Sequence, residues 1–289
     1  MPGLLRSVRD HCAEVAAQAS HVRIDLDKAG AIEPGPEPAL DPERHYLEGS
    51  KEDVAAYLLT LDAINFGSGW FPTLRKRPGC PGYYTVASAL ADRFRQQGPW
   101  SAEALRTLGA AEIAAVLGQE PGHELMALYA RALNDLGRFV GDRAALDIAA
   151  GGSAERLAED LARGMPFFDD VGFWKRAQIA ANDLALAGIA QFADIDELTV
   201  FADNLVPHVL RVDGVLVYDE ALSAHIDSGK LLPPGREESE IRACAVQACE
   251  AIAAELRLPP RILDVMLWNR GQATRYKALP RHRTRTVFY

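Results

Sequence analysis

Proline and glycine breaks divide this chain of 289 residues into segments whose apolar residues recur at helical spacing. The longest break covers residues 30–42, where four prolines deny the backbone donors that a helix or a sheet ladder needs. No linker is long enough to separate two domains. The pattern therefore predicts a mainly α fold, with one helical domain over residues 1–289.

Eleven segments have the apolar spacing of helices. They cover residues 4–20, 51–62, 83–97, 101–107, 110–118, 122–140, 153–163, 172–190, 219–228, 237–256 and 261–272. Ser50 is expected to cap the second segment, and Gly118 is expected to end the fifth. Residues 209–218 leave two possibilities open, because the turn at Asp213–Gly214 suits a short hairpin or two helices joined by a glycine.

The composition excludes several classes of protein. A net charge of −9 argues against a general nucleic-acid binder, although it leaves room for a small basic pocket that holds one phosphate. The four cysteines and seven histidines form no metal-binding pattern, and no glycine-rich cofactor loop is present. Without a signal peptide or a membrane-spanning run, the sequence favours a cytoplasmic enzyme or binding protein that uses no metal and no cofactor.

An acidic residue interrupts the apolar run Phe201–Pro207. Burying an ionised carboxylate is costly unless it is paired or hydrogen-bonded. Asp203 is therefore either the N-cap of a helix that starts at Asn204, with Pro207 in its first turn, or a working acid. Local sequence leaves both interpretations open.

Other polar side chains also stand in apolar surroundings. Asp264 interrupts an apolar helix, either as a ligand-binding acid or as an early residue favoured by the helix dipole. Lys175, Gln178 and Asn182 share one helix face, which indicates a pocket wall; the alternative is an internal bridge from Arg176 with Lys175 in solvent. Carboxylates beside aromatic rings suit a flat, cationic ligand or a reaction with an oxocarbenium-like transition state.

Several motifs in this chain resemble those of the queuosine salvage family, in order from about residue 45 to the C-terminus. The motifs are Leu61–Phe66, Phe173–Ile179, Phe201–Pro207, Glu240–Arg242, Leu267–Trp268 and His282–Tyr289. Agreement of many motifs in one order makes the resemblance far more specific than any motif alone.

The resemblance implies a queuosine 5′-phosphate N-glycosidase, which releases the 7-deazaguanine base queuine for reuse in tRNA modification. It implies a fold like that of the helical, helix-hairpin-helix type DNA glycosylases, a small-molecule substrate, and no direct contact with nucleic acid or membrane. Its catalytic acid corresponds to Asp203. At Val265 and Asn269 this chain departs from the tyrosine and the second aspartate that members often carry.

The remaining candidate site residues fall into two groups. Base or ligand contacts are expected from His45, Phe66, Phe201, Asp264, Val265, Trp268 and Asn269. Phosphate contacts are expected from Lys175, Arg176, His282 and Arg283. Two alternatives are a non-catalytic carrier of queuine or a related nucleoside, and a base-excision glycosylase, which the acidic net charge disfavours.

Overall fold

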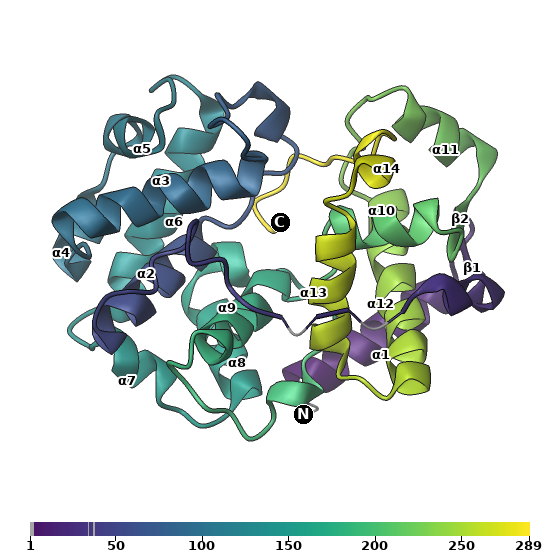
Figure 1. The fold of residues 1–289 in the computed structure, drawn as a ribbon, viewed down its shortest axis with the longest axis horizontal. Coiled ribbons are helices and arrows are strands. Elements are labelled where there is room, and N and C mark those ends of the chain that lie inside the picture. The colour runs from purple at the N-terminus through teal and green to yellow at the C-terminus, as the bar shows by residue number, and fades with distance from the viewer. Residues whose placement is uncertain (1–2, 34, 37) are drawn as a thin grey trace. The chain divides into compact units, whose positions relative to one another are not determined.

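The computed structural model describes residues 3–33, 35, 36 and 38–289, and these residues form a mainly helical protein, as predicted (Figure 1). They belong to two compact units. Unit 1 comprises Met1–Pro38, Val171–Lys175 and Asp196–Thr286, and unit 2 comprises Ala39–Asp170, Arg176–Ile195 and Val287–Tyr289. Each unit is assembled from three separate stretches of the chain. The expectation of a single domain over residues 1–289 stays a prediction.

The long helix α12 (Arg236–Leu256) lies at the centre of unit 1. It contacts α1 (Leu4–Ala17), α10 (Leu205–Val212), α13 (Pro260–Arg270) and the strand β1. The other elements of this unit are β1 (Val22–Ile24), η1 (Leu26–Ala31), β2 (Leu216–Tyr218), α11 (Glu220–Asp227) and α14 (Thr274–Lys277). Small residues on α12, such as Ala243 and Cys244, are fully buried and let the neighbouring helices approach closely.

Both possibilities left open for residues 209–218 are wrong. Helix α10 ends at Val212, Gly214 turns the chain with a φ of 85°, and β2 follows. β2 pairs antiparallel with β1, so that Val22 lies opposite Tyr218. A local pattern cannot reveal a strand partner this distant in sequence, which explains the error.

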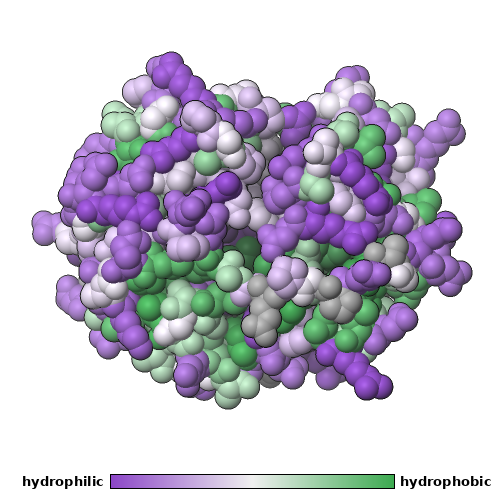
Figure 2. Space-filling view, viewed as in Figure 1, coloured by the Kyte–Doolittle hydropathy of each residue, from purple (hydrophilic) through white to green (hydrophobic). Residues whose placement is uncertain are grey.

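Helix α6 (Glu124–Val140) organises unit 2. It contacts α2 (Lys51–Ala63), α4 (Ala102–Thr107) and α5 (Ala110–Leu117). The other elements are η2 (Phe71–Thr73), α3 (Gly82–Gln97), α7 (Ala145–Ala149), α8 (Ala154–Gly164) and η3 (Pro166–Phe168), with most of α9 (Lys175–Leu186) and the start of η4 (Ile195–Glu197). Hydrophilic residues predominate over α3 and α4 in Figure 2, as expected of helices that bury one face.

Two caps in unit 2 are confirmed. The Ser50 hydroxyl accepts a hydrogen bond from the Asp53 amide at 3.1 Å and starts α2, and Gly118 ends α5 in the left-handed conformation with a φ of 64°. Both residues satisfy backbone groups that a helix end leaves exposed.

The helix predicted over residues 172–190 is shorter than expected. It begins at Lys175, because Gly172 has a φ of 90° and Trp174 a φ of 44°, and both values exclude right-handed helix. Gly172 is also required by space, since a Cβ there would lie 2.4 Å from the ring of His11. The helix ends at Leu186, before a turn at Gly188 with a φ of 66°.

Two further predictions concern the proline-rich loop over residues 30–42 and the absence of a membrane-spanning segment. Residues 34 and 37 of the proline-rich loop lie outside the described residues. Across the part that the structure does describe, no helix combines the length and the apolar character that crossing a membrane would need.

Candidate active site

The candidate catalytic loop, residues 201–204, leads directly into α10 in unit 1. Phe201, Ala202 and Asn204 are buried, whereas Asp203 is half-buried. Oδ1 of Asp203 accepts hydrogen bonds from the amides of Leu205 at 2.6 Å and Val206 at 3.2 Å. The cap interpretation is therefore correct in its hydrogen bonds, although the helix starts one residue later than predicted. Because Asp203 as a residue is only half-buried, capping does not exclude a chemical role.

Three buried groups from other elements hold the catalytic loop. Oδ1 of Asp264, on α13, accepts a hydrogen bond from the Phe201 amide at 2.8 Å. Nε of Arg242, on α12, donates to the Ala202 carbonyl at 2.9 Å. The Asn204 amide group donates to the carbonyl of His282 at 3.3 Å. Each residue of the loop is thus fixed by a separate contact, which is the rigidity that a preorganised site needs.

Helix α13 carries four of the predicted base-binding residues. Asp264 is buried, Val265 and Trp268 are half-buried, and Asn269 is exposed. Asp264 and Trp268 are four positions apart and share one helix face, and Val265 and Asn269 share the adjacent face in the same way. The structure therefore brings Asp264 to the catalytic loop and groups the other three near it along one helix.

Cationic groups gather near Asp203 within unit 1. Burial lowers the pKa of Arg281, an effect that the nearby Asp203 carboxylate opposes and Arg283 reinforces. Burial also lowers the pKa of His282 to about 3, and Arg242 acts in the same direction. His282 therefore stays neutral at physiological pH and can offer an anion a hydrogen bond but no charge.

The neutral, buried His282 leads to a prediction on stability. Its pKa lies below the usual value of about 6.5, so between these values the unfolded chain binds a proton that the folded chain does not. The free energy of unfolding should therefore fall as the pH is lowered from about 6.5 towards 3. The buried His208 and His45, whose pKa values burial also lowers, act in the same direction.

Urea unfolding of wild type and His282→Gln at pH 7, 6, 5 and 4 measures this effect. The variant should lose less stability than wild type across this range, by on the order of 1–3 kcal/mol. His225→Gln, at a half-exposed histidine on α11, serves as the control. Parallel pH profiles for wild type and His282→Gln would show that His282 makes no such contribution.

Three predicted site residues, His45, Phe66 and Arg176, belong to unit 2. The His45 ring is fixed at both nitrogens, with Nδ1 2.9 Å from the Asp41 carbonyl and Nε2 3.0 Å from the Tyr83 hydroxyl. Nδ1 must be the donor to that carbonyl, so the tyrosine hydroxyl donates to Nε2. Phe66 is 1% exposed and meets Tyr129 edge-on at 5.0 Å between ring centroids, which favours a packing role.

The charge of Arg176 is enclosed within unit 2, since the residue is only 1% exposed. Its guanidinium donates to the carbonyls of Asp62 at 3.1 Å and Ala63 at 2.8 Å, and to the carbonyls of Phe167 and Val287. It also lies over the rings of Phe66 and Phe168, at 4.7 and 4.6 Å from their centroids. Burial lowers the pKa of Arg176 to about 9, so it remains a cation at neutral pH. These contacts favour a structural role over contact with phosphate.

The face of α9 that was predicted to be a pocket wall is buried, with Lys175 6%, Gln178 0% and Asn182 2% exposed. The alternative to the pocket wall was an internal bridge from Arg176 to Asp183. Backbone carbonyls, and not Asp183, accept the hydrogen bonds of the Arg176 guanidinium. Asp183 instead accepts a hydrogen bond from the amide group of Asn182 at 3.3 Å.

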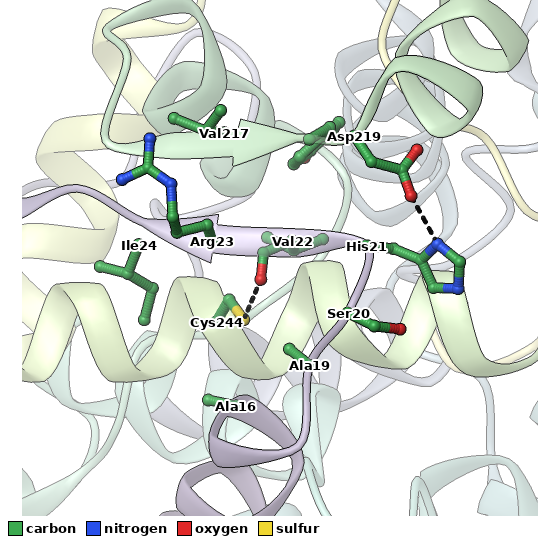
Figure 3. Close-up of a pocket in the computed structure, with 11 residues that line it drawn as sticks. Ala16, Ala19, Ser20, His21, Val22, Arg23, Ile24, Val217, Asp219 and Cys244 are labelled. Carbon is green, nitrogen blue, oxygen red and sulfur yellow. Dashed lines mark hydrogen bonds and ion pairs between the residues drawn. The ribbon is translucent and has the colours of Figure 1, made fainter.

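A surface pocket of about 480 Å³ lies elsewhere in unit 1, between β1, β2 and α12 (Figure 3). The His21 ring is held there by Asp219, with Nδ1 2.7 Å from Oδ2, and Cys244 lies against the Val22 carbonyl. None of the predicted site residues lines this pocket. This pocket is therefore separate from the candidate active site.

Arg242, which holds the catalytic loop, was not among the predicted site residues. It was noticed only as part of the motif Glu240–Arg242. The signal available for Arg242 was an arginine followed directly by the small, apolar run Ala243–Val246 in a long helix. A buried arginine needs groups that accept its hydrogen bonds or balance its charge, but the sequence around it does not show which residues provide them.

Comparison with known proteins places these residues in context. A family model described as queuosine salvage protein matches residues 45–289. A Sphaerobacter thermophilus protein named queuosine 5′-phosphate N-glycosylase/hydrolase is 34% identical, with 100% of this chain and 99% of the relative covered. A protein of the same name from Nematostella vectensis is 30% identical over 86% of this chain and 85% of the relative. One from Dictyostelium discoideum is 40% identical over 41% of this chain and 40% of the relative.

Proposed function

Because this chain belongs to the queuosine salvage protein family and is an N-glycosidase of queuosine 5′-phosphate, we propose that Asp203 is the carboxylate that faces the reacting sugar. One observation supports this role most directly. Asp203 is the half-exposed residue of a loop whose other three members are buried, and a cap fixes one of its oxygens. Asp203 is thus only partly covered by the protein, and its carboxylate is held in place by the cap.

The chemistry of the substrate calls for such a group. Many enzymes that cleave purine nucleosides protonate N7 of the base, but a 7-deazapurine has carbon at this position. The enzyme must therefore stabilise the positive charge that develops on the sugar as the bond to the base breaks. A fixed carboxylate beside the anomeric carbon does this electrostatically or by direct attack. Addition of water then yields queuine and ribose 5-phosphate.

We place the base against α13 and the catalytic loop. Asp264 binds the Phe201 amide through Oδ1, and we assign its carboxylate the further task of accepting from the guanine-like edge of the base. Trp268 and Phe201 are the proposed stacking residues, with Val265 and Asn269 on the adjacent helix face. A base bound by Asp264 would then be coupled to the loop that carries Asp203.

The phosphate requires local cations, because the chain as a whole is acidic. Lys175, His282 and Arg283 remain proposed phosphate contacts, and Arg281 joins them because its charge is coupled to that of Asp203. Arg283 donates to the Gly229 carbonyl at 2.6 Å, which fixes one end of its guanidinium. Arg176 is the weakest candidate, since it is enclosed by backbone carbonyls.

Phosphate recognition leads to a prediction on substrate preference. Arg281→Gln is expected to lower kcat/KM for the nucleotide by about tenfold or more while changing that for unphosphorylated queuosine much less. Arg283→Gln and Lys175→Gln should act in the same way with smaller effects. Arg275→Gln, at an exposed arginine paired with Asp213, is the matched control. Equal kcat/KM for nucleotide and nucleoside in wild type would reject the phosphate site, and an unchanged preference in a variant would reject only that residue.

The function itself is tested by incubating the purified chain with queuosine 5′-phosphate and separating the products by chromatography. Release of queuine and ribose 5-phosphate in equal amounts is expected. Tight binding of queuine without its release from the nucleotide would instead identify a carrier. Release of a base from damaged double-stranded DNA, with none from the nucleotide, would identify a base-excision glycosylase.

Two finer proposals complete this assignment. We propose that the helices follow the arrangement of helical DNA glycosylases, a proposal supported by the helical content and by an acid at the start of a helix next to α12 and α13. Superposition of an experimental structure on such a glycosylase tests it. We also propose a cytoplasmic location without direct binding of nucleic acid or membrane, which cell fractionation and a DNA-binding titration test.

A further inference from the structure

We infer that Arg242 is a positioning residue for Asp203, because its buried guanidinium fixes the peptide group from which Asp203 projects. The inference rests on the proposed catalytic role of Asp203. It assigns Arg242 a function through Asp203 and no contact with the substrate.

The decisive contact is the hydrogen bond from Nε of Arg242 to the Ala202 carbonyl, 2.9 Å long and buried. This carbonyl belongs to the planar peptide group that joins Ala202 to Asp203. Holding its oxygen restrains the rotation of the peptide plane, and with it the position of the Asp203 Cα from which the side chain projects. The Asp203 cap on α10 fixes only the far end of the same side chain.

Arg242 is itself held on its other sides. Its Cζ lies 3.9 Å from the ring centroid of Phe173, and Nη1 lies 3.5 Å from Oε1 of Glu238, one turn earlier on α12. Phe173 is in turn held edge-on by His11, at 5.4 Å between ring centroids. A planar guanidinium can stack on a ring and donate from its edge at the same time, whereas an ammonium cannot.

This arrangement joins three separated parts of unit 1. Phe173 precedes α9, Arg242 lies in the middle of α12, and Ala202 belongs to the catalytic loop. A residue that only filled space would not need a directed bond to the carbonyl next to the reacting acid. Misplacing a catalytic group by about 1 Å can cost on the order of 100-fold in rate, so loss of this bond should appear in turnover.

The test compares Arg242→Met, Arg242→Lys and the double variant Arg242→Met/Glu238→Gln with Arg236→Met. Arg236 is the matched control, since it lies on the same helix and pairs with Glu240 at 2.8 Å but has a side chain that is 62% exposed. For each protein, kcat and KM for queuosine 5′-phosphate, the Kd for free queuine and the melting temperature are measured. The double variant removes the glutamate charge that Arg242→Met leaves behind.

Both Arg242→Met and Arg242→Lys are expected to lower kcat by about 10- to 100-fold, while the Kd for queuine stays within about threefold. Lysine should not rescue turnover, because it keeps the charge but lacks the Nε–H donor. Arg236→Met should keep wild-type kcat. Should Arg242→Met fail to fold, the lysine and double variants decide the question. A folded variant without the Nε–H bond that keeps wild-type kcat would overturn the inference.

Combining Arg242→Met with Asp203→Asn separates positioning from an independent role. If Arg242 acts through Asp203, the arginine substitution should change the residual rate of Asp203→Asn by no more than about twofold. A further full loss in the double variant would show that Arg242 acts elsewhere. Near wild-type turnover of Asp203→Asn alone would reject the proposed catalytic role of Asp203. That outcome is distinct from a result that rejects positioning by Arg242.

Discussion

Asp203→Asn is expected to lower kcat for queuosine 5′-phosphate by about a thousandfold or more, with little change in the fold or in affinity for queuine. Asparagine keeps the side-chain oxygen that accepts from the amides of Leu205 and Val206, and it caps helices about as well as aspartate. It removes the negative charge that the developing sugar cation needs. The substitution therefore separates the two functions of one carboxylate.

Two comparisons make this result specific. Asp203→Ala removes both the cap and the charge, so it should lose the same activity and in addition about 0.5–2 kcal/mol of stability. Asp219→Asn changes another capping aspartate of unit 1, which accepts from the Leu222 amide at 2.7 Å, and should keep wild-type kcat. If Asp203→Asn turns over within a few-fold of wild type, Asp203 is a helix cap and the reacting acid lies elsewhere. Steady-state kinetics and thermal melts of the four proteins measure these effects.

Arg176→Met is expected to destabilise the protein by several kcal/mol, and so to lower the melting temperature by roughly 10 °C or more. The guanidinium satisfies carbonyls at the end of α2, in η3 and at Val287. Without it these buried acceptors lose their donors, and each costs about 1–3 kcal/mol when left unsatisfied. Arg176→Lys should recover only part of the loss, because one ammonium cannot reach so many acceptors in one plane.

Arg131 offers the matched control for this prediction. It also lies over an aromatic ring of unit 2, with Cζ 5.0 Å from the centroid of Phe167, but the residue is exposed. Arg131→Met should shift the melting temperature by no more than a few degrees. A comparable small shift for Arg176→Met would mean that water or repacked side chains satisfy the carbonyls, and that Arg176 is free to take another role.

Sequence periodicity predicted a helix well where one face of the segment is apolar and the other is polar. Helices such as α3 and α8 show a regular apolar stripe with a clear start and stop, and each lies within one or two residues of its predicted bounds. The short helices α7 and α14 were not predicted, since five or four residues are too few to establish a period. The start of α9 was missed because Trp174 adopts a left-handed conformation that its residue type does not signal.

For the candidate site too, the sequence showed local patterns but not the contacts between residues far apart in the chain. Asp203 and Asp264 were singled out because each interrupts an apolar run, and both prove to bind backbone amides. What the sequence could not show is that Asp264 holds Phe201, 63 positions earlier in the chain, or that Arg242 holds Ala202, 40 positions away. Such contacts depend on how the helices of unit 1 pack, and no short motif encodes that packing.

The last three residues of the chain, Val287–Tyr289, belong to unit 2, although the 91 residues before them, 196–286, belong to unit 1. The Gly67 amide binds the Tyr289 carbonyl at 3.0 Å, and Arg176 binds that of Val287. During synthesis, unit 2 cannot complete these contacts until residues 287–289 have been made, after the whole 196–286 stretch of unit 1. Folding of unit 2 is therefore expected to finish only once residues 287–289 have emerged, and their appearance, rather than that of α9, should mark the gain of protease resistance.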